Sequence, residues 1–125
     1  MTTGLTTTLS FTVAAEDTAA AVGSGDLPVL GTPRVLAWLE SATCAAVADA
    51  LPQGSTTVGT RVSLQHLAAS PVGARIAAQA TVLFVDGRLL RFEVAATDVD
   101  SGTLLAHGEI TRVVVDTGRF LSRVR

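Results

Sequence analysis

Apolar and polar residues follow two different periods along this chain. Between residues 32 and 51 the apolar positions recur every three to four residues, the period of an amphipathic helix. We expect this helix to begin at Thr32, because a Thr hydroxyl can cap free backbone N–H groups and Pro33 is tolerated in the first turn. It is expected to run to about Leu51. One stripe carries Val35, Leu36, Leu39, Thr43, Ala46, Val47 and Ala50, and the opposite side carries Arg34, Trp38 and Asp49.

A period of two residues marks the strands on either side of this helix. Leu9, Phe11 and Val13 alternate with polar residues in a first strand that starts at about Leu5. After the helix, one strand face is expected to carry Val58, Thr60, Val62, Leu64 and His66. Further strands are predicted at Ile76–Val85, Arg88–Asp98 and Thr103–Val115, with Asp86-Gly87 as a strong hairpin signal. Residues 15–22 favour a helical turn, and residues 23–31 an irregular loop.

This order of elements predicts an α+β fold of the hotdog type, in which a curved antiparallel sheet wraps around one long central helix. A conical α+β barrel has a similar length, but it usually opens with helices, whereas this chain opens with a strand. The chain has 125 residues, which suits one domain over residues 1–125.

Composition indicates whether the protein contacts a membrane, whether it forms a subunit interface, and where it is located. Hydrophobic residues make up 48% of the chain, yet its apolar runs are far shorter than the ~20 residues that span a bilayer. We therefore expect no membrane partner, and the apolar surplus predicts a subunit interface, most simply a homodimer. The N-terminus lacks the basic and apolar regions of a secretory signal, so the expected location is the cytoplasm.

The charge distribution argues against a nucleic-acid-binding protein, and the cysteine content excludes disulfide-linked and cysteine-rich metal proteins. The net charge is −2 and the arginines are dispersed, whereas nucleic-acid binding needs a concentrated basic face. All nine basic residues are arginine, which is typical of a GC-rich bacterial genome. The single cysteine, Cys44, excludes an intramolecular disulfide and a cysteine-rich metal site, and it is expected to pack as a small apolar residue.

Glu40 is the most unusual residue of the predicted helix, because it lies at the margin of the apolar stripe, beside Leu36, Val47 and Cys44. An ionised carboxylate there is costly unless it is paired or hydrogen-bonded. Taken alone, it is more often a half-exposed border residue or a member of a structural ion pair. The third interpretation is a catalytic carboxylate, since perturbed groups gather at functional sites.

Two further residues gain meaning only in combination with Glu40. A lone His66 on an apolar strand face is more often a hydrogen-bonded core or interface residue, and Thr32 is first of all a helix cap. Together the carboxylate and the imidazole supply a base or nucleophile and its proton partner. His107 has the wrong strand parity to complete a zinc set with them, and there is neither a phosphate loop nor a G-x-S-x-G elbow. We therefore predict no metal and no cofactor.

The spacing of Thr32, Glu40 and His66, in TPRVLAWLE and GTRVSLQHLAASPVG, resembles the fluoroacetyl-CoA thioesterase-like family of hotdog proteins. The similarity extends over nearly the whole chain and includes VDGRLLRFEVAATD and the stretch from Arg112 to Phe120. It implies hydrolysis of acyl-coenzyme A thioesters by a Thr/Glu/His set at these three positions. It also implies that a backbone amide near Gly59 holds the thioester carbonyl, and that Arg112 matches a family arginine on the last strand, assigned here to substrate binding.

One departure from the family limits what the resemblance implies. Members selective for the fluorinated acyl group carry phenylalanines in the lid before the helix, and the segment GSGDLPVLG has none. The resemblance therefore implies a thioesterase but leaves its acyl group open, and the sequence does not distinguish Glu40 as a nucleophile from Glu40 as a base.

Two other functions stay open. A non-catalytic binder of acyl-CoA or apolar ligands is possible on this fold, although it would not need all three polar residues. A hotdog hydratase would want an acidic residue and a histidine close together on one loop-helix segment, and the chain has no such pair.

Overall fold

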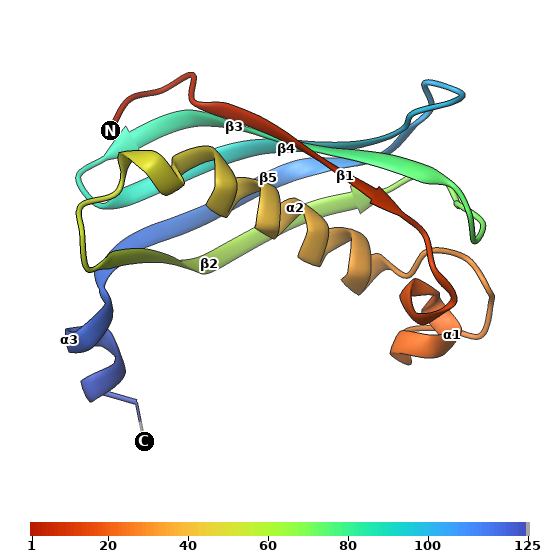
Figure 1. The fold of residues 1–125 in the computed structure, drawn as a ribbon, viewed down its shortest axis with the longest axis horizontal. Coiled ribbons are helices and arrows are strands. Elements are labelled where there is room, and N and C mark those ends of the chain that lie inside the picture. The colour runs from red at the N-terminus through yellow and green to blue at the C-terminus, as the bar shows by residue number, and fades with distance from the viewer. Residues whose placement is uncertain (125) are drawn as a thin grey trace.

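The chain folds as one curved antiparallel sheet with a long helix on its inner face (Figure 1). The computed structural model describes residues 1–124. The sheet order is β1-β3-β4-β5-β2, which confirms the predicted α+β hotdog layout. Among the described residues, no helix is long and apolar enough to cross a membrane. The elements are β1 (Thr6–Thr12), η1 (Ala15–Asp17), α1 (Ala19–Val22), α2 (Thr32–Val47), η2 (Ala48–Ala50), β2 (Ser55–His66), β3 (Arg75–Asp86), β4 (Leu89–Asp98), β5 (Leu104–Asp116) and α3 (Thr117–Ser122).

Local sequence signals set most of these boundaries. Gly87 adopts φ +59° in the β3–β4 turn, as expected of a two-residue hairpin, and Gly102 adopts φ +73° in the β4–β5 turn. The short helix α3 was not predicted from the sequence. It is capped by the Asp116 carboxylate, which accepts a hydrogen bond from the Arg119 amide at 2.8 Å. Six residues are too few to show a helical period.

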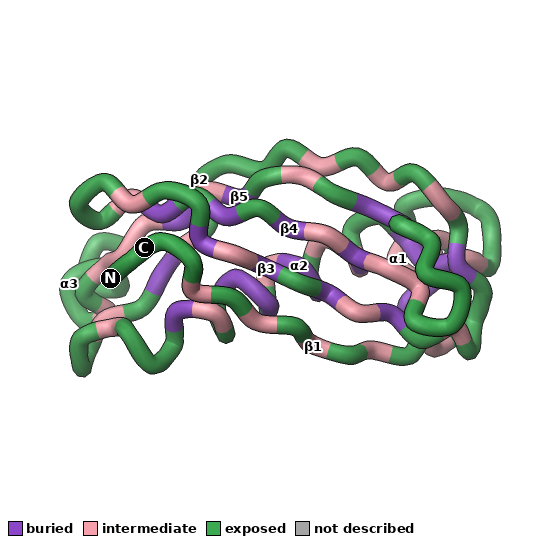
Figure 2. The backbone as a smooth tube through the Cα atoms, turned by 90° about the horizontal axis from the view of Figure 1, so that it is seen from above, coloured by how far each residue is buried: buried purple, intermediate pink, exposed green. Residues whose placement is uncertain are grey.

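The apolar face of α2 is wider than the predicted stripe. Val35, Leu39 and Val47 are buried as expected. Trp38 was expected on the polar side, but it is only 8% exposed and its ring stacks on Phe11, with centroids 4.6 Å apart. The prediction failed because the sheet curves, so that β1 packs along the side of α2 and covers it. In Figure 2 the buried segments lie mainly on α2, β3, β4 and β5.

The helix begins at Thr32 and continues through η2 to Ala50, which confirms the predicted bounds. The predicted cap was wrong, because the N-cap is Gly31, and Thr32 is the first helical residue with no capping hydrogen bond from its side chain. A Cβ at position 31 would lie 2.9 Å from Val22 Cγ2 and 3.1 Å from Ala19 Cα, so only glycine lets α1 pack this closely. At the other end, α2 tightens into the 3₁₀ turn η2 before Leu51.

Cys44 was expected to pack as a small apolar residue, and this was wrong. Its side chain is exposed on α2, on the flank that β1 does not cover. Helical periodicity places Cys44 one turn after Glu40, on the same open side of the helix.

A β-bulge changes the predicted faces of β2. The register with β5 shifts between Gly59 and Arg61, and Thr60 has no partner in it. Thr57 is therefore buried, although strict alternation put it on the face opposite Val58. The extra residue brings Gly59 and His66 to the same face of the sheet, although their positions differ by seven. Val62 lies on this edge strand and is 42% exposed.

Candidate functional site

Thr32 and His66 meet where α2 begins and β2 ends. The Thr32 Oγ1 atom lies 2.8 Å from His66 Nδ1, and either atom can donate, depending on the imidazole tautomer. The other ring nitrogen, Nε2, is buried and has no hydrogen-bond partner among the described residues. This histidine therefore has one nitrogen that is held by the threonine and one buried nitrogen without a partner among the described residues.

A pocket of about 260 Å³ opens beside this pair. The loop of residues 23–31 forms one wall and is held against residues 67–71 by the Leu30 amide, which donates to the Ser70 carbonyl at 2.8 Å. No phenylalanine, tyrosine or tryptophan lines the pocket, and its walls combine small apolar residues with polar ones. Besides Thr32 and His66, they are Ala19, Ser24, Val29, Leu30, Leu67, Ala68 and Ala69.

Glu40 belongs to a second cluster, with a buried arginine. Its Oε2 atom lies 3.3 Å from Arg112 Nη1, and the Glu40 side chain is 38% exposed whereas that of Arg112 is 9% exposed. Arg112 is fixed by Thr57, because its Nε donates to Oγ1 at 2.8 Å and its Nη2 donates to the backbone carbonyl at 3.0 Å. The carboxylate is thus ion-paired and half-exposed at the margin of the helix, as its position in the sequence predicted, with one oxygen toward the guanidinium.

Gly59 leaves the space that this carboxylate occupies. A Cβ at position 59 would lie 2.9 Å from Glu40 Oε2 and 3.4 Å from Arg112 Nη1. The backbone of β2 therefore approaches the carboxylate more closely than any other residue type would allow. Thr60, the residue left unpaired by the bulge, directly follows, so the backbone is irregular at this point of an edge strand.

The two clusters are separated within one chain. Thr32 and Glu40 are eight residues apart in one helix, which places their Cα atoms about 12 Å apart along its axis. The structure therefore brings together Thr32 with His66, and Glu40 with Arg112 and Gly59, but it does not bring all five residues to one point. Arg112 touches the carboxylate itself, which the sequence alone did not indicate.

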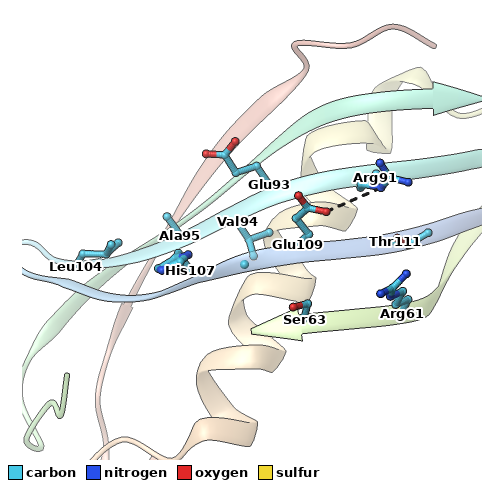
Figure 3. Close-up of a pocket in the computed structure, with 11 residues that line it drawn as sticks. Arg61, Ser63, Arg91, Glu93, Val94, Ala95, Leu104, His107, Glu109 and Thr111 are labelled. Atoms are coloured by element: carbon cyan, nitrogen blue, oxygen red, sulfur yellow. Dashed lines mark ion pairs between the residues drawn. The ribbon is translucent and has the colours of Figure 1, made fainter. Parts of the chain in front are cut away.

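A further hollow lies on the outer face of the sheet, away from both clusters (Figure 3). It measures about 780 Å³ and carries charges of both signs, with Arg91 and Glu109 4.0 Å apart. His107 points into this hollow, so the sheet separates it from His66 and Glu40, and the zinc set considered above is not assembled. Within the described residues, no group of three His, Cys, Asp or Glu side chains could hold a metal ion.

Comparisons with known proteins identify the family of this chain. A profile of the fluoroacetyl-CoA-specific thioesterase family (FlK) matches residues 13–118. The fluoroacetyl-CoA thioesterase of Streptantibioticus cattleyicolor is 32% identical over 98 residues, which are 78% of this chain and 68% of that protein. A crystal structure of FlK superposes with a TM-score of 0.92 at 27% identity, covering 100% of this chain and 96% of the other.

Two further structures extend the comparison. A variant of FlK in complex with fluoroacetate and CoA superposes with a TM-score of 0.87 at 27% identity, covering 96% of this chain and 99% of the other. A hot-dog-like protein from Thermanaerovibrio acidaminovorans shares the fold with a TM-score of 0.87 at 24% identity, covering 98% and 89%. The chain therefore belongs to the fluoroacetyl-CoA-specific thioesterase family of acyl-CoA thioester hydrolases with the hotdog fold.

Proposed function

We propose that the protein hydrolyses acyl-CoA thioesters and that Thr32, Glu40 and His66 carry the reaction. The observation that supports this most directly is the Thr32–His66 hydrogen bond beside a pocket, with Nε2 of His66 unpartnered among the described residues. The pocket suits the acyl group, because most of its lining residues are apolar and none is an acidic residue or an arginine. Its lack of phenylalanine, tyrosine and tryptophan is our reason for not extending the fluorinated substrate of the relatives to this chain.

The separation of the two clusters leads us to propose a homodimer with composite sites. Strand β2 is at the edge of the sheet, and its outward backbone groups are free to pair with a second copy. An antiparallel β2–β2 pair centred on Ser63, with Thr60 as the extra residue of the bulge, would put Gly59 opposite His66 of the partner subunit. Glu40 of one subunit would then lie beside Thr32 and His66 of the other, and exposed Val62 would be covered.

The chemistry of thioester hydrolysis suits these groups. An oxygen attacks the carbonyl carbon, the carbon–sulfur bond breaks, and the thiolate leaves with little assistance before it takes up a proton. Thr32 positions the imidazole of His66, whose unpartnered nitrogen can move that proton. A backbone amide near Gly59 is assigned to the carbonyl oxygen, where charge develops in the transition state. Arg112 is assigned to positioning Glu40 rather than to direct substrate binding, because it is buried and three of its five N–H donors hold it to Thr57 and Glu40.

Glu40 has two possible roles that an isotope experiment separates. As a nucleophile it would form a mixed anhydride, and attack of ¹⁸O water on the glutamyl carbonyl of that anhydride would label the Glu40 carboxylate in a single turnover. As a base it would activate water, and the label would enter the acid product and never the carboxylate. Label in Glu40, detected by mass spectrometry of the protein after one turnover, therefore establishes the nucleophile.

The test of the function is hydrolysis of acyl-CoA esters by the parent protein and by Glu40→Gln and His66→Ala. Loss of a base or nucleophile typically lowers kcat by about 10²-fold or more. Glu109→Gln is the matched control, since it neutralises an ion-paired glutamate on the outer face of the sheet. Unchanged hydrolysis by Glu40→Gln would contradict the proposal. Tight binding of acyl-CoA by a parent protein that hydrolyses none of a broad panel would instead establish a binding protein.

A further inference from the structure

Three arginines that have no carboxylate partner among residues 1–124 gather at one end of the molecule. Of the eight described arginines, Arg34, Arg75, Arg91 and Arg112 each lie within 4.0 Å of a carboxylate oxygen. Of the four others, Arg61 lies on the outer face of the sheet, whereas Arg88, Arg119 and Arg123 line one small surface pocket between the β3–β4 turn and α3. Arg88, Arg119 and Arg123 form the cluster that we call the α3 arginines.

The pocket of the α3 arginines carries a net positive charge. Its only acidic residue is Asp116, whose carboxylate already accepts the hydrogen bond from the Arg119 amide as the helix cap. All three arginines are exposed, so their guanidinium groups are open to a ligand. Guanidinium groups bind phosphate oxygens with paired, charge-assisted hydrogen bonds, which makes such a cluster suited to a phosphate-rich ligand.

A groove leads from the Glu40 cluster toward these arginines. It measures about 420 Å³, lies between the second half of α2 and the start of β2, and includes both Thr57 and Cys44. Thr57 holds Arg112, the ion-pair partner of Glu40, and Cys44 follows Glu40 by one helical turn, so this end of the groove is the one nearer the Glu40 cluster. The other end reaches Gly54, whose carbonyl accepts a hydrogen bond at 2.9 Å from the amide of Thr117, the first residue of α3.

The length of this path matches the pantetheine arm of coenzyme A. Twelve bonds separate the thioester sulfur from the oxygen of the first phosphate, equivalent to four residues of extended backbone or roughly 14 Å. On the protein, Arg112 and Asp116 are separated by four residues of β5, which span about 13 Å. A thioester at Glu40 therefore places the diphosphate beside α3.

We propose that the groove holds the pantetheine arm of the substrate and that the α3 arginines bind the phosphate groups of its nucleotide. This inference rests on the proposed thioesterase function and assigns the part of the site that binds coenzyme A rather than the acyl group. Ser55–Thr57 lie on the edge of β2 outside the stretch from Gly59 to His66 that the proposed dimer pairs, so their backbone groups are available to the amides of the arm, as in addition of a peptide strand to a sheet edge.

Truncated substrates provide the kinetic test. Hydrolysis of one acyl group is measured as its CoA thioester, its dephospho-CoA thioester and its pantetheine thioester, which lacks the nucleotide. For the parent, we expect KM to rise in that order. Arg88→Ala and Arg119→Ala should each raise KM for the CoA thioester by about tenfold, as expected for a lost charge-assisted hydrogen bond, and leave KM for the pantetheine thioester unchanged. Arg75→Ala is the matched control, because it removes an exposed arginine at the opposite end of the sheet.

Equal KM values of the parent for the CoA and pantetheine thioesters would overturn the inference, and so would arginine variants that behave like Arg75→Ala. In either result hydrolysis itself persists, so the proposed function would stand.

Cys44 supplies a second readout that does not depend on turnover. It is the single cysteine, it is exposed, and it lines the groove. A thioether analogue of acyl-CoA, which carries no free thiol, should slow the labelling of Cys44 by a maleimide in the parent. The same concentration of the analogue should slow the labelling of Cys44 much less in an Arg88→Ala/Arg119→Ala variant. Protection without hydrolysis would retain the binding site and refute the thioesterase, whereas no protection of a parent that hydrolyses acyl-CoA would refute the groove.

Discussion

Gly59→Ala should lower activity without unfolding the protein, because the only atoms in its way belong to the ends of side chains. The new Cβ would lie 2.9 Å from Glu40 Oε2, whereas ordinary contact begins at 3.4 Å. The carboxylate must therefore retreat by about 0.5 Å, and its 3.3 Å contact with Arg112 must rearrange. Misplacement of a catalytic group by about 1 Å can cost 10²-fold, so half that distance should lower kcat by roughly tenfold.

Stability should change far less than activity in this variant. Glycine is exposed at this position of β2 and adopts an ordinary φ, so alanine adds no backbone strain. We expect the free energy of unfolding in urea to change by less than about 1 kcal/mol. Gly118→Ala is the control, since its Cβ would meet only Asp116 Oδ1 at 3.7 Å. A Gly59→Ala protein with parental kcat would refute the idea that the carboxylate acts from this position. An unfolded Gly59→Ala protein would refute the idea that the Glu40 side chain can move aside for the new Cβ.

Three further outcomes follow from the structure. Thr32→Val should lower kcat because it removes the hydrogen bond to His66 while Gly31 still caps the helix, and Thr32→Ser should restore kcat; equal kcat in both variants would contradict this. Trp38→Ala should lower the free energy of unfolding by about 3 kcal/mol or more, whereas Trp38→Phe should retain most of it through the stack on Phe11, as read from urea titrations. The hydrogen bond and charge of Arg75 lower the pKa of Asp100, so any stability from this exposed pair is present above the ordinary carboxyl pKa and lost as the pH falls through the lowered one. Arg75→Ala should raise the pKa of Asp100 in a carboxyl NMR titration, and an unmoved pKa would contradict the pairing.

Periodicity predicted the strands and the long helix, because each element shows a clear apolar pattern over at least seven residues. It failed where a residue depends on the curvature of the sheet. Trp38 and Phe11 are distant in the chain, and only the curvature of the sheet brings β1 over that side of α2. The predicted assignment of β2 residues to the two faces of the sheet failed before Arg61, because the bulge at Thr60 carries no signal of its own in the sequence.

The candidate site was only partly accessible to sequence reasoning. The marginal position of Glu40 followed from helical geometry, but its partner Arg112 lies 72 residues away, and no local pattern links them. The spacing of Thr32 and Glu40 already implied about 12 Å between them along a straight helix, which argues for a site shared between subunits. That consequence becomes visible once β2 is seen at the sheet edge.

We infer that Glu40 of one subunit acts with Thr32 and His66 of the other. An experiment that mixes two inactive variants tests this inference. Glu40→Gln and His66→Ala are unfolded together in equal amounts, refolded, and assayed for acyl-CoA hydrolysis per dimer, with the mass of the assembly measured against 12.8 kDa for one chain. Random pairing makes half of the dimers mixed, and each mixed dimer has one intact site of two, so activity should return to about a quarter of the parental value. Mixtures no more active than the separate variants, or a monomer of 12.8 kDa that hydrolyses acyl-CoA, would contradict the account.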